Sequence, residues 1–265
     1  MLELLKAAIL GIVEGLTEFL PISSTGHLIV AADLLNFEGD AAATFEIFIQ
    51  LGAVLAVLWY YRRDLRAQLR ALPTDRATQR FWLNVFIAFL PAAAVGFLLH
   101  DWIKSVLFDP AVVAVSLIVG GIVFLLIERK PPVSTVHDLQ GVTARQAAAI
   151  GVAQIVSLIP GVSRSGATIV GGFLAGLDRT TAVAFSFYLA LPTLGLATLF
   201  DLATNLDQLT RDDLILMAVG LVFAFVTALL VIGWLLRYVA GHTFRIFGYY
   251  RIIAGALVLL WLALT

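Results

Sequence analysis

The amino-acid sequence predicts an all-α polytopic membrane protein with two repeats of inverted topology. Its composition is the first indication: 61% of the 265 residues are hydrophobic and 13% are charged, whereas soluble domains have about 45–50% and about 25%. The second is a pair of polar motifs 140 positions apart, and the third is an alternation of basic and acidic loops. We therefore expect six transmembrane helices and two re-entrant helical hairpins in one membrane domain, residues 1–265.

Six apolar stretches are long enough to span the hydrocarbon core of a bilayer, which requires about 20 helical residues. They lie at 43–61, 81–99, 111–127, 180–200, 214–236 and 248–264. Two further apolar regions are interrupted by polar turns, so that their arms are 4–20 with 27–35, and 147–159 with 166–177. Most of these arms reach only about 15–20 Å, or half of the core. This length favours re-entrant hairpins, with kinked full-length spans as the alternative.

The two polar turns, residues 21–26 and 160–165, belong to an internal repeat. A shift of 140 positions aligns Gly11 with Gly151, Glu14 with Gln154, Ser23 with Ser163, Gly26 with Gly166, Ile29 with Ile169, Phe45 with Phe185 and Leu51 with Leu191. We assign the first repeat to about 1–130 and the second to about 145–265. Polar backbone at membrane depth is costly unless it lines a cavity, so both turns are expected to share one site.

Loop charges predict the orientation in the membrane. The 62–80 loop carries six arginines, and the next basic loops add Arg129, Lys130, Arg145, Arg237, Arg245 and Arg251. The loops at 100–110 and 201–213 have one basic residue each, Lys104 and Arg211. The positive-inside rule places the three basic loops in the cytoplasm and both termini outside. Because each repeat has three spans, an odd number, the two repeats have opposite orientations in the membrane. The two hairpins then enter from opposite faces and meet near the midplane.

The first hairpin carries acid, hydroxyl and imidazole groups. Glu14 and Glu18 are four residues apart and share one helical face, and intramembrane carboxylates are costly enough to suggest a function. The turn that follows adds the side chains of Ser23, Ser24, Thr25 and His27. We interpret Glu14, Glu18, Ser24 and His27 as candidate catalytic residues. The alternatives are a polar face of a surface helix for the two glutamates and helix capping for the hydroxyls.

The second turn has the composition of a phosphate-binding site. Arg164 lies between Ser163 and Ser165, and a new helix starts near Gly166, with Thr168 one turn further on. A planar guanidinium, hydroxyls and free N–H groups at a helix start all bind phosphate oxygens. We therefore expect these residues, with Ser23 and Thr25, to bind the substrate. Snorkelling of Arg164 to the interface is the alternative.

A diphosphate beside Glu14 and Glu18 requires compensation of charge. Each carboxylate would repel it by roughly 2–3 kcal/mol at ~6 Å and an effective dielectric constant near 20. Either one glutamate is protonated or both bind a divalent cation, for which we expect Mg²⁺, with Ca²⁺ as the alternative. Base, nucleophile and phosphate ligand together indicate phosphoryl transfer to water. The nucleophile could be Ser24 activated by Glu18 or His27, His27 itself, or water activated by His27.

Residues 14–27 and 160–168 resemble the two signature motifs of bacterial undecaprenyl-diphosphate phosphatases, the bacitracin-resistance proteins. The resemblance extends over the whole chain in length, span pattern and motif spacing. It implies an enzyme of the bacterial cytoplasmic (inner) membrane that removes the terminal phosphate of undecaprenyl diphosphate, so that the lipid carrier returns to peptidoglycan synthesis. It also matches Glu14 and Glu18 to the acidic motif, His27 and Arg164 to the functional His and Arg, and Ser24 to the catalytic hydroxyl cluster.

Other classes of protein fit the sequence less well. Inverted repeats with broken helices are typical of secondary transporters, so a polyprenyl-phosphate flippase or anion transporter is the main alternative, although transport needs no hydroxyl–His–Glu group. Lipid phosphatases of the acid-phosphatase type need a later histidine, and none follows Arg164 before His242. A net charge of -1 argues against nucleic acid as a partner. A homodimer is compatible with the sequence.

Overall fold

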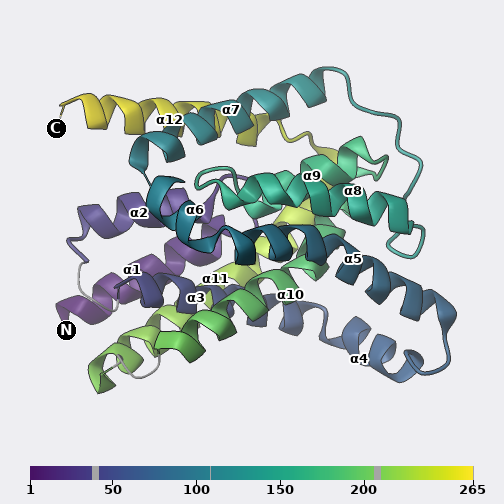
Figure 1. Ribbon diagram of the computed structural model, residues 1–265, viewed down its shortest axis with the longest axis horizontal. Helices are drawn as coiled ribbons and strands as arrows, with labels where there is room; N and C mark the ends of the chain where they lie inside the picture. Colours follow the sequence, from purple (N-terminus) through teal and green to yellow (C-terminus); the bar gives the residue numbers. More distant parts are fainter. Residues whose placement is uncertain (38–41, 108, 206–209, 265) are drawn as a thin grey trace.

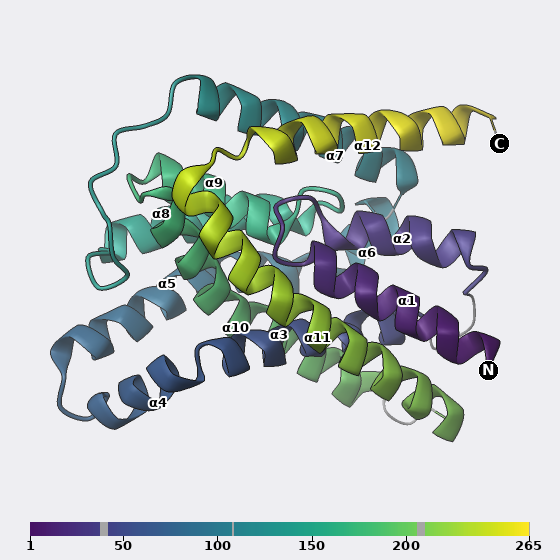
Figure 2. The ribbon, with the colours of Figure 1, turned by 180° about the vertical axis from the view of Figure 1, so that it is seen from behind.

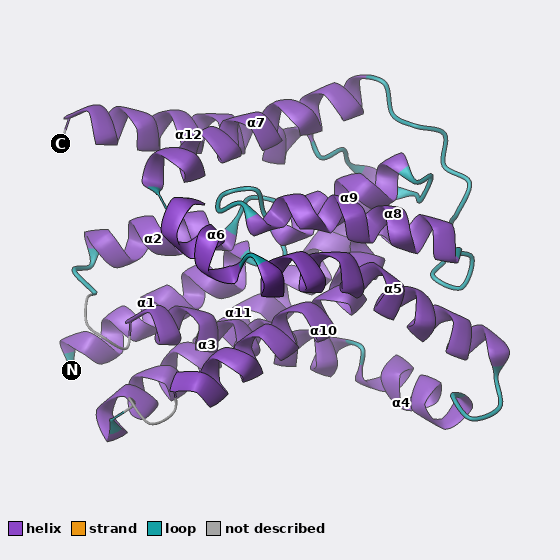
Figure 3. Ribbon diagram, viewed as in Figure 1, coloured by secondary structure: helices purple, strands orange, loops and turns teal. Residues whose placement is uncertain are grey.

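The structure is a computed structural model that describes residues 1–37, 42–107, 109–205 and 210–264. Its regular structure there is helical (Figure 3), apart from an isolated bridge between Val136 and Leu177. The prediction of an all-α protein is thus confirmed. In Figures 1 and 2 the helices lie in a bundle, with both termini at the same end of its long axis.

Each predicted span coincides with a helix. These are α3 (Ala42–Tyr60), α5 (Arg76–Leu98), α7 (Pro110–Arg129), α10 (Arg179–Asn205), α11 (Arg211–Gly241) and α12 (Arg245–Leu264). Within the described residues, five of them are long and apolar enough to cross a membrane alone. The exception, α3, meets that criterion only together with α4 (Arg62–Ala71), from which it is bent by 70°. The chain is therefore a polytopic membrane protein, with five candidate spans among the described residues, or six if α3 and α4 count as one.

Two segments that the sequence analysis treats as loops contain helices. One is α4, which is rich in arginine and has no buried residue. The other is α6 (His100–Leu107), which lies between α5 and α7. Both are short, and neither has the length of apolar sequence on which the assignment of spans rests.

The two interrupted apolar regions each fold into a pair of short helices. The first pair is α1 (Leu2–Thr17) and α2 (Ser24–Leu34). The second pair is α8 (Ala144–Ile155) and α9 (Arg164–Leu174), with a 3₁₀ turn at Val156–Leu158 after α8. Within each pair the helices pack against each other, and α1 also packs on α11 while α8 packs on α5.

The two turns have the same backbone geometry, at positions 140 apart. Ser23 and Ser163 precede α2 and α9 with left-handed φ angles of 74° and 73°. Each serine oxygen accepts the N–H three residues later, from Gly26 at 3.4 Å and from Gly166 at 3.1 Å. A left-handed conformation is unfavourable for serine, and the capping bond helps to offset this cost. Repetition of the sequence is thus matched by repetition of an uncommon local structure.

Glycines let the hairpins approach their neighbouring helices closely. A Cβ atom at Gly11 of α1 would overlap the carbonyl oxygen of Gly220 in α11. At the equivalent position in α8, a Cβ atom on Gly151 would lie 2.5 Å from the carbonyl oxygen of Ala88 in α5. Small residues at helix contacts are the usual means of close packing in membranes. This packing fixes each hairpin against one long helix and so determines where its turn lies.

Candidate active site

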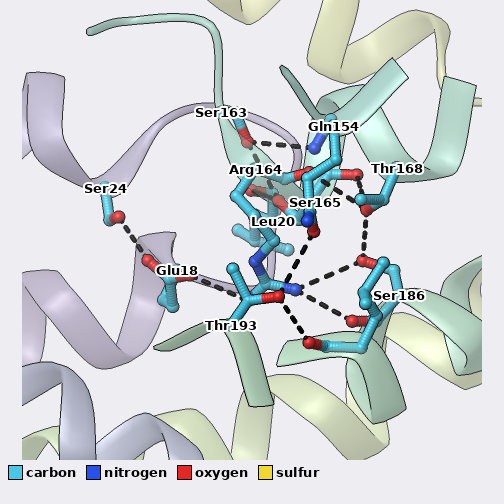
Figure 4. Close-up of polar contacts among 12 residues, drawn as sticks. Glu18, Leu20, Ser24, Gln154, Ser163, Arg164, Ser165, Thr168, Ser186 and Thr193 are labelled. Carbon is cyan, nitrogen blue, oxygen red and sulfur yellow. Dashed lines mark hydrogen bonds and ion pairs between the residues drawn. The ribbon is translucent and has the colours of Figure 1, made fainter. Parts of the chain in front are cut away.

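The polar ends of the two hairpins meet at a buried ion pair. Arg164, at the start of α9, donates from Nη2 to Oε1 of Glu18, just after α1, at 2.9 Å. Figure 4 shows the two side chains reaching toward each other from different hairpins. Only 8% of the Arg164 side chain and 5% of the Glu18 side chain are exposed. The acidic motif and the basic motif, far apart in sequence, therefore form one site.

Glu18 also orients a hydroxyl group. Ser24 Oγ donates to Oε2 of Glu18 at 2.5 Å, and this serine is the first residue of α2. Each carboxylate oxygen of Glu18 thus has a different partner, one from each hairpin. A carboxylate that accepts a hydrogen bond from a serine hydroxyl is arranged like a general base beside its nucleophile. The structure brings together Glu18, Ser24 and Arg164 from the predicted set.

A second set of bonds holds Arg164 from the side of α10. Its Nη1 donates to the carbonyl oxygen of Ser186 at 2.9 Å and to its hydroxyl at 3.3 Å. That hydroxyl bonds to Thr168, whose own hydroxyl lies 3.0 Å from the Arg164 carbonyl oxygen. Sequence reasoning missed Ser186, since a lone serine inside an apolar span is a weak signal. Thr168 acts on the guanidinium through Ser186.

One nitrogen of the Arg164 guanidinium has no hydrogen-bond partner within the described part of the chain. The Nε atom is buried and has no hydrogen-bond partner. A buried guanidinium N–H without an acceptor is costly. An anionic oxygen would satisfy it. This geometry fits the expectation that Arg164 binds a phosphate group.

The two serines beside Arg164 connect the hairpins. Ser165 donates to the carbonyl oxygen of Leu20 at 2.9 Å, and its Oγ lies 2.9 Å from that of Ser163. Because a carbonyl only accepts, Ser163 is the donor to Ser165, and both hydroxyl protons are used within the protein. Among the other predicted substrate-binding residues, Thr25 is half-buried in the first turn of α2 and Gly26 is buried.

His27 has a different set of partners from Ser24. Its Nδ1 lies 2.7 Å from the Ser23 carbonyl oxygen, so Nδ1 carries a proton. In the neutral ring Nε2 then accepts from the hydroxyl of Tyr250 in α12, at 2.6 Å, and the two rings are stacked. Among the described residues, no hydrogen bond joins the imidazole to Ser24 or Glu18. Sequence reasoning missed Tyr250, because the contact depends on how α12 packs.

Glu14 is a buried carboxylate that makes no hydrogen bond to any described residue. It is 0% exposed, and neither oxygen has a hydrogen bond within the described residues. A carboxylate in this state requires a proton or a cation. The described residues contain no cluster of three or more His, Cys, Asp or Glu side chains that could bind a metal. Glu14 and Glu18 nevertheless fit Mg²⁺, which is commonly bound by one or two carboxylates together with substrate phosphates.

Fold and site together define a polytopic membrane protein with a buried acid–hydroxyl–arginine site between two helical hairpins. The family model of the bacitracin resistance protein BacA matches residues 7–257, and the chain belongs to this family. The undecaprenyl-diphosphatase of Methylobacillus flagellatus is 52% identical over 264 residues, which cover 98% of each chain. That of Laribacter hongkongensis is 51% identical over 258 residues, which cover 97% of this chain and 94% of the other. That of Acinetobacter baumannii is 49% identical over 259 residues, which cover 97% and 95%.

Proposed function

We propose that the protein is a membrane phosphatase that hydrolyses undecaprenyl diphosphate to undecaprenyl phosphate and orthophosphate. The observation that carries this proposal is the bonding of Glu18 to both Ser24 and Arg164. A general base, a hydroxyl nucleophile and an arginine that can bind phosphate then lie in direct contact in one buried site. We infer the substrate, undecaprenyl diphosphate, from the name undecaprenyl-diphosphatase that the relatives carry. The product is the lipid carrier of peptidoglycan synthesis, and its recycling accounts for bacitracin resistance.

The proposed reaction has two steps. Glu18 takes the proton of Ser24 as its Oγ attacks the terminal phosphorus, and the anhydride bond breaks to release the lipid monophosphate. Water then attacks the phosphoserine, the bond between phosphorus and Ser24 Oγ breaks, and Glu18 returns its proton to that oxygen. Ser24 is thus restored as an alcohol, and orthophosphate leaves with the oxygen and hydrogens of the water. Throughout, Arg164 stabilises negative charge on the transferred phosphoryl group through Nε and its shared Nη groups.

A divalent ion would lower the charge repulsion between the diphosphate and the acidic residues. We infer that Glu14 is its main protein ligand, because this carboxylate has no hydrogen-bond partner among the described residues. Glu18 is the second candidate ligand, although both its oxygens are bonded. In the absence of the ion, Glu14 needs a proton to remain buried. Removal of divalent ions with a chelator is therefore expected to abolish hydrolysis while the helical content persists.

His27 is the second candidate for the nucleophile. Its contacts favour a supporting role instead, since Nδ1 is bonded to Ser23 and Nε2 to Tyr250. Stopping the reaction with SDS at neutral pH, with a substrate radiolabelled in the terminal phosphate, and then testing the acid and base stability of the protein-bound label distinguishes the two. An acid-stable label on Ser24 is the expected result. An acid-labile, base-stable label would instead identify His27, and no label would favour direct attack by water.

We also propose that the chain consists of two inverted repeats, about 1–130 and 145–265, with six spans and two re-entrant hairpins. The pairing of helices supports this: α1 with α11 is matched by α8 with α5, and α7 packs on α12. Equivalent backbone geometry at Ser23 and Ser163 supports it further. With the basic loops in the cytoplasm, the termini and the opening of the first hairpin face outward. The diphosphate is then processed at the outer leaflet.

Orthophosphate release by the purified protein tests the proposal. The protein in detergent receives undecaprenyl diphosphate with Mg²⁺ or Ca²⁺, and we expect one orthophosphate per lipid. A flippase or transporter moves its substrate between two compartments, which detergent removes, and does not cleave the anhydride bond. Such a protein would therefore release no orthophosphate. No release from folded protein with either ion would therefore contradict the phosphatase and favour the transporter.

A further inference from the structure

Arg251 is a charged residue buried in the middle of the protein. It belongs to α12 and is 0% exposed. The prediction that Arg251 is a charge of a cytoplasmic loop is wrong, because the residue lies inside a helix and is buried. No carboxylate lies within ion-pair distance of it in the described part of the chain. A buried cation without a counter-ion must be stabilised by other groups.

Backbone carbonyl oxygens provide that stabilisation. Nη1 donates to Pro21 and Val162, both at 3.0 Å. Nη2 donates to Gly161 at 3.0 Å and Ser116 at 3.2 Å. Nε donates to Leu117 at 3.3 Å. A guanidinium has five N–H donors, and all five are used. Arg251 thus has no donor left for a substrate.

The acceptors of these bonds lie in both motif turns. Pro21 and Gly161 occupy equivalent positions of the repeat, each two residues before the serine that caps the next helix. One guanidinium therefore joins the first turn, the second turn and α7. The space for it depends on Gly120 of α7, where a Cβ atom would overlap Nη2 of Arg251. Figure 2 shows α12 running alongside α7, past the level of both turns.

We propose that Arg251 is a positioning residue that holds the two motif turns in register. The proposal rests on the phosphatase function, because the register matters for catalysis only if Glu18 and Arg164 act on one substrate. Charge-assisted bonds to carbonyls are strong and directional. Glu18 lies three residues before Pro21, and Arg164 lies two residues after Val162. A shift of one turn against the other would therefore separate the base from the phosphate ligand, and about 1 Å of misplacement can cost about 100-fold in rate.

Kinetics of Arg251 variants test this role. We expect Arg251→Met to fold but to hydrolyse undecaprenyl diphosphate with a kcat about 100-fold below that of the parent and a much smaller change in KM. The lipid tail still binds, so the loss falls on the chemical step. Arg251→Lys keeps the charge and part of the bonding, and its kcat should lie between the two. A folded Arg251→Met variant with kcat within about twofold of the parent would overturn the proposal.

Gly120→Ala provides a second route, which keeps the guanidinium but occupies the space of Nη2. It should also lower kcat more than it raises KM, and the double variant with Arg251→Met should be no slower than Arg251→Met alone. Multiplication of the two losses would contradict a shared role. If Arg251→Met does not fold, the kcat of Gly120→Ala alone tests the positioning role, and a kcat equal to that of the parent would contradict it. The control is Arg179→Met, which removes an ion pair with Glu128 away from the turns and should lower thermal stability with kcat unchanged.

A distance measurement separates this proposal from the phosphatase function. The chain has no cysteine, so spin labels can be placed at Leu34 of α2 and Leu174 of α9, which are exposed and equivalent in the repeat. We expect a narrow distance distribution in the parent and a broader or shifted one in Arg251→Met. An unchanged distribution would contradict the positioning role even if the parent hydrolyses the lipid. A parent that does not hydrolyse it would contradict only the function.

Discussion

Glu18 joins the chemistry of the two hairpins, because its two oxygens accept from Ser24 and Arg164. Glu14, one helical turn earlier, has no hydrogen-bond partner in the part of the chain that the structure describes. Two glutamates that look equivalent in sequence therefore differ in role: one is a candidate base and the other a candidate ligand of a cation. Their environments, rather than their residue type, determine this difference.

Tyr250 offers a test of the role of His27. Tyr250→Phe removes the hydroxyl that bonds to Nε2 and leaves the stacked rings. If His27 only orients the first turn, loss of one hydrogen bond of about 1 kcal/mol should lower kcat by no more than about tenfold. Tyr249→Phe, at an exposed neighbouring position, is the matched control and should match the parent. A loss above about 100-fold would indicate instead that His27 acts on the reacting atoms.

The hairpins depend on close contact with one long helix each. Gly11 allows α1 to lie against α11, and Gly151 allows α8 to lie against α5. Positions of the spans and arms could be predicted, because hydrophobic length and Pro/Gly/Ser turns are local signals. The helices α4 and α6 could not, because their sequences lack that signal. Neither could the burial of Arg251, since only tertiary packing distinguishes it from a loop arginine.

Alanine at either hairpin glycine should destabilise the protein. Gly11→Ala and Gly151→Ala each place a Cβ atom against a backbone carbonyl of the neighbouring helix, and overpacking of this kind typically costs about 1–3 kcal/mol. Thermal unfolding in detergent should show a lower midpoint for both. The control is Gly241→Ala, where no atom lies within 4 Å of the added Cβ. Parental stability in both hairpin variants would contradict the observed packing.

At the scale of the whole molecule, the proposed pair of repeats would supply a symmetric frame with different groups in its two halves. Glu14 is matched by Gln154 and Ser24 by Arg164. The sequence therefore predicted which hairpin carries the acids and which carries the arginine. It could not show that Arg164 bonds directly to Glu18, or that Ser186 and Tyr250 hold the functional side chains. Those contacts join segments that are distant in the chain, and single-sequence patterns contain no record of them.

Cysteine labelling tests the proposed orientation. The parent has no cysteine, so a single one at Leu69 of α4 or at Leu2 of α1, both exposed, reports on one side of the membrane. A membrane-impermeant maleimide should label the Leu2→Cys variant in cells with only the outer membrane opened. It should label Leu69→Cys only after the inner membrane is also permeabilised. The reverse pattern would place the basic loops outside.

The central claim is that one site, built from both hairpins, hydrolyses the lipid diphosphate. A double-mutant cycle on Glu18→Gln and Arg164→Met, measured as orthophosphate release from undecaprenyl diphosphate, tests it most directly. If the two residues act as one unit, each single variant should lose at least about 100-fold in rate. The double variant should then be little slower than the slower of the two single variants. Folded single variants that match the parent, or losses that multiply in the double variant, would contradict a shared site.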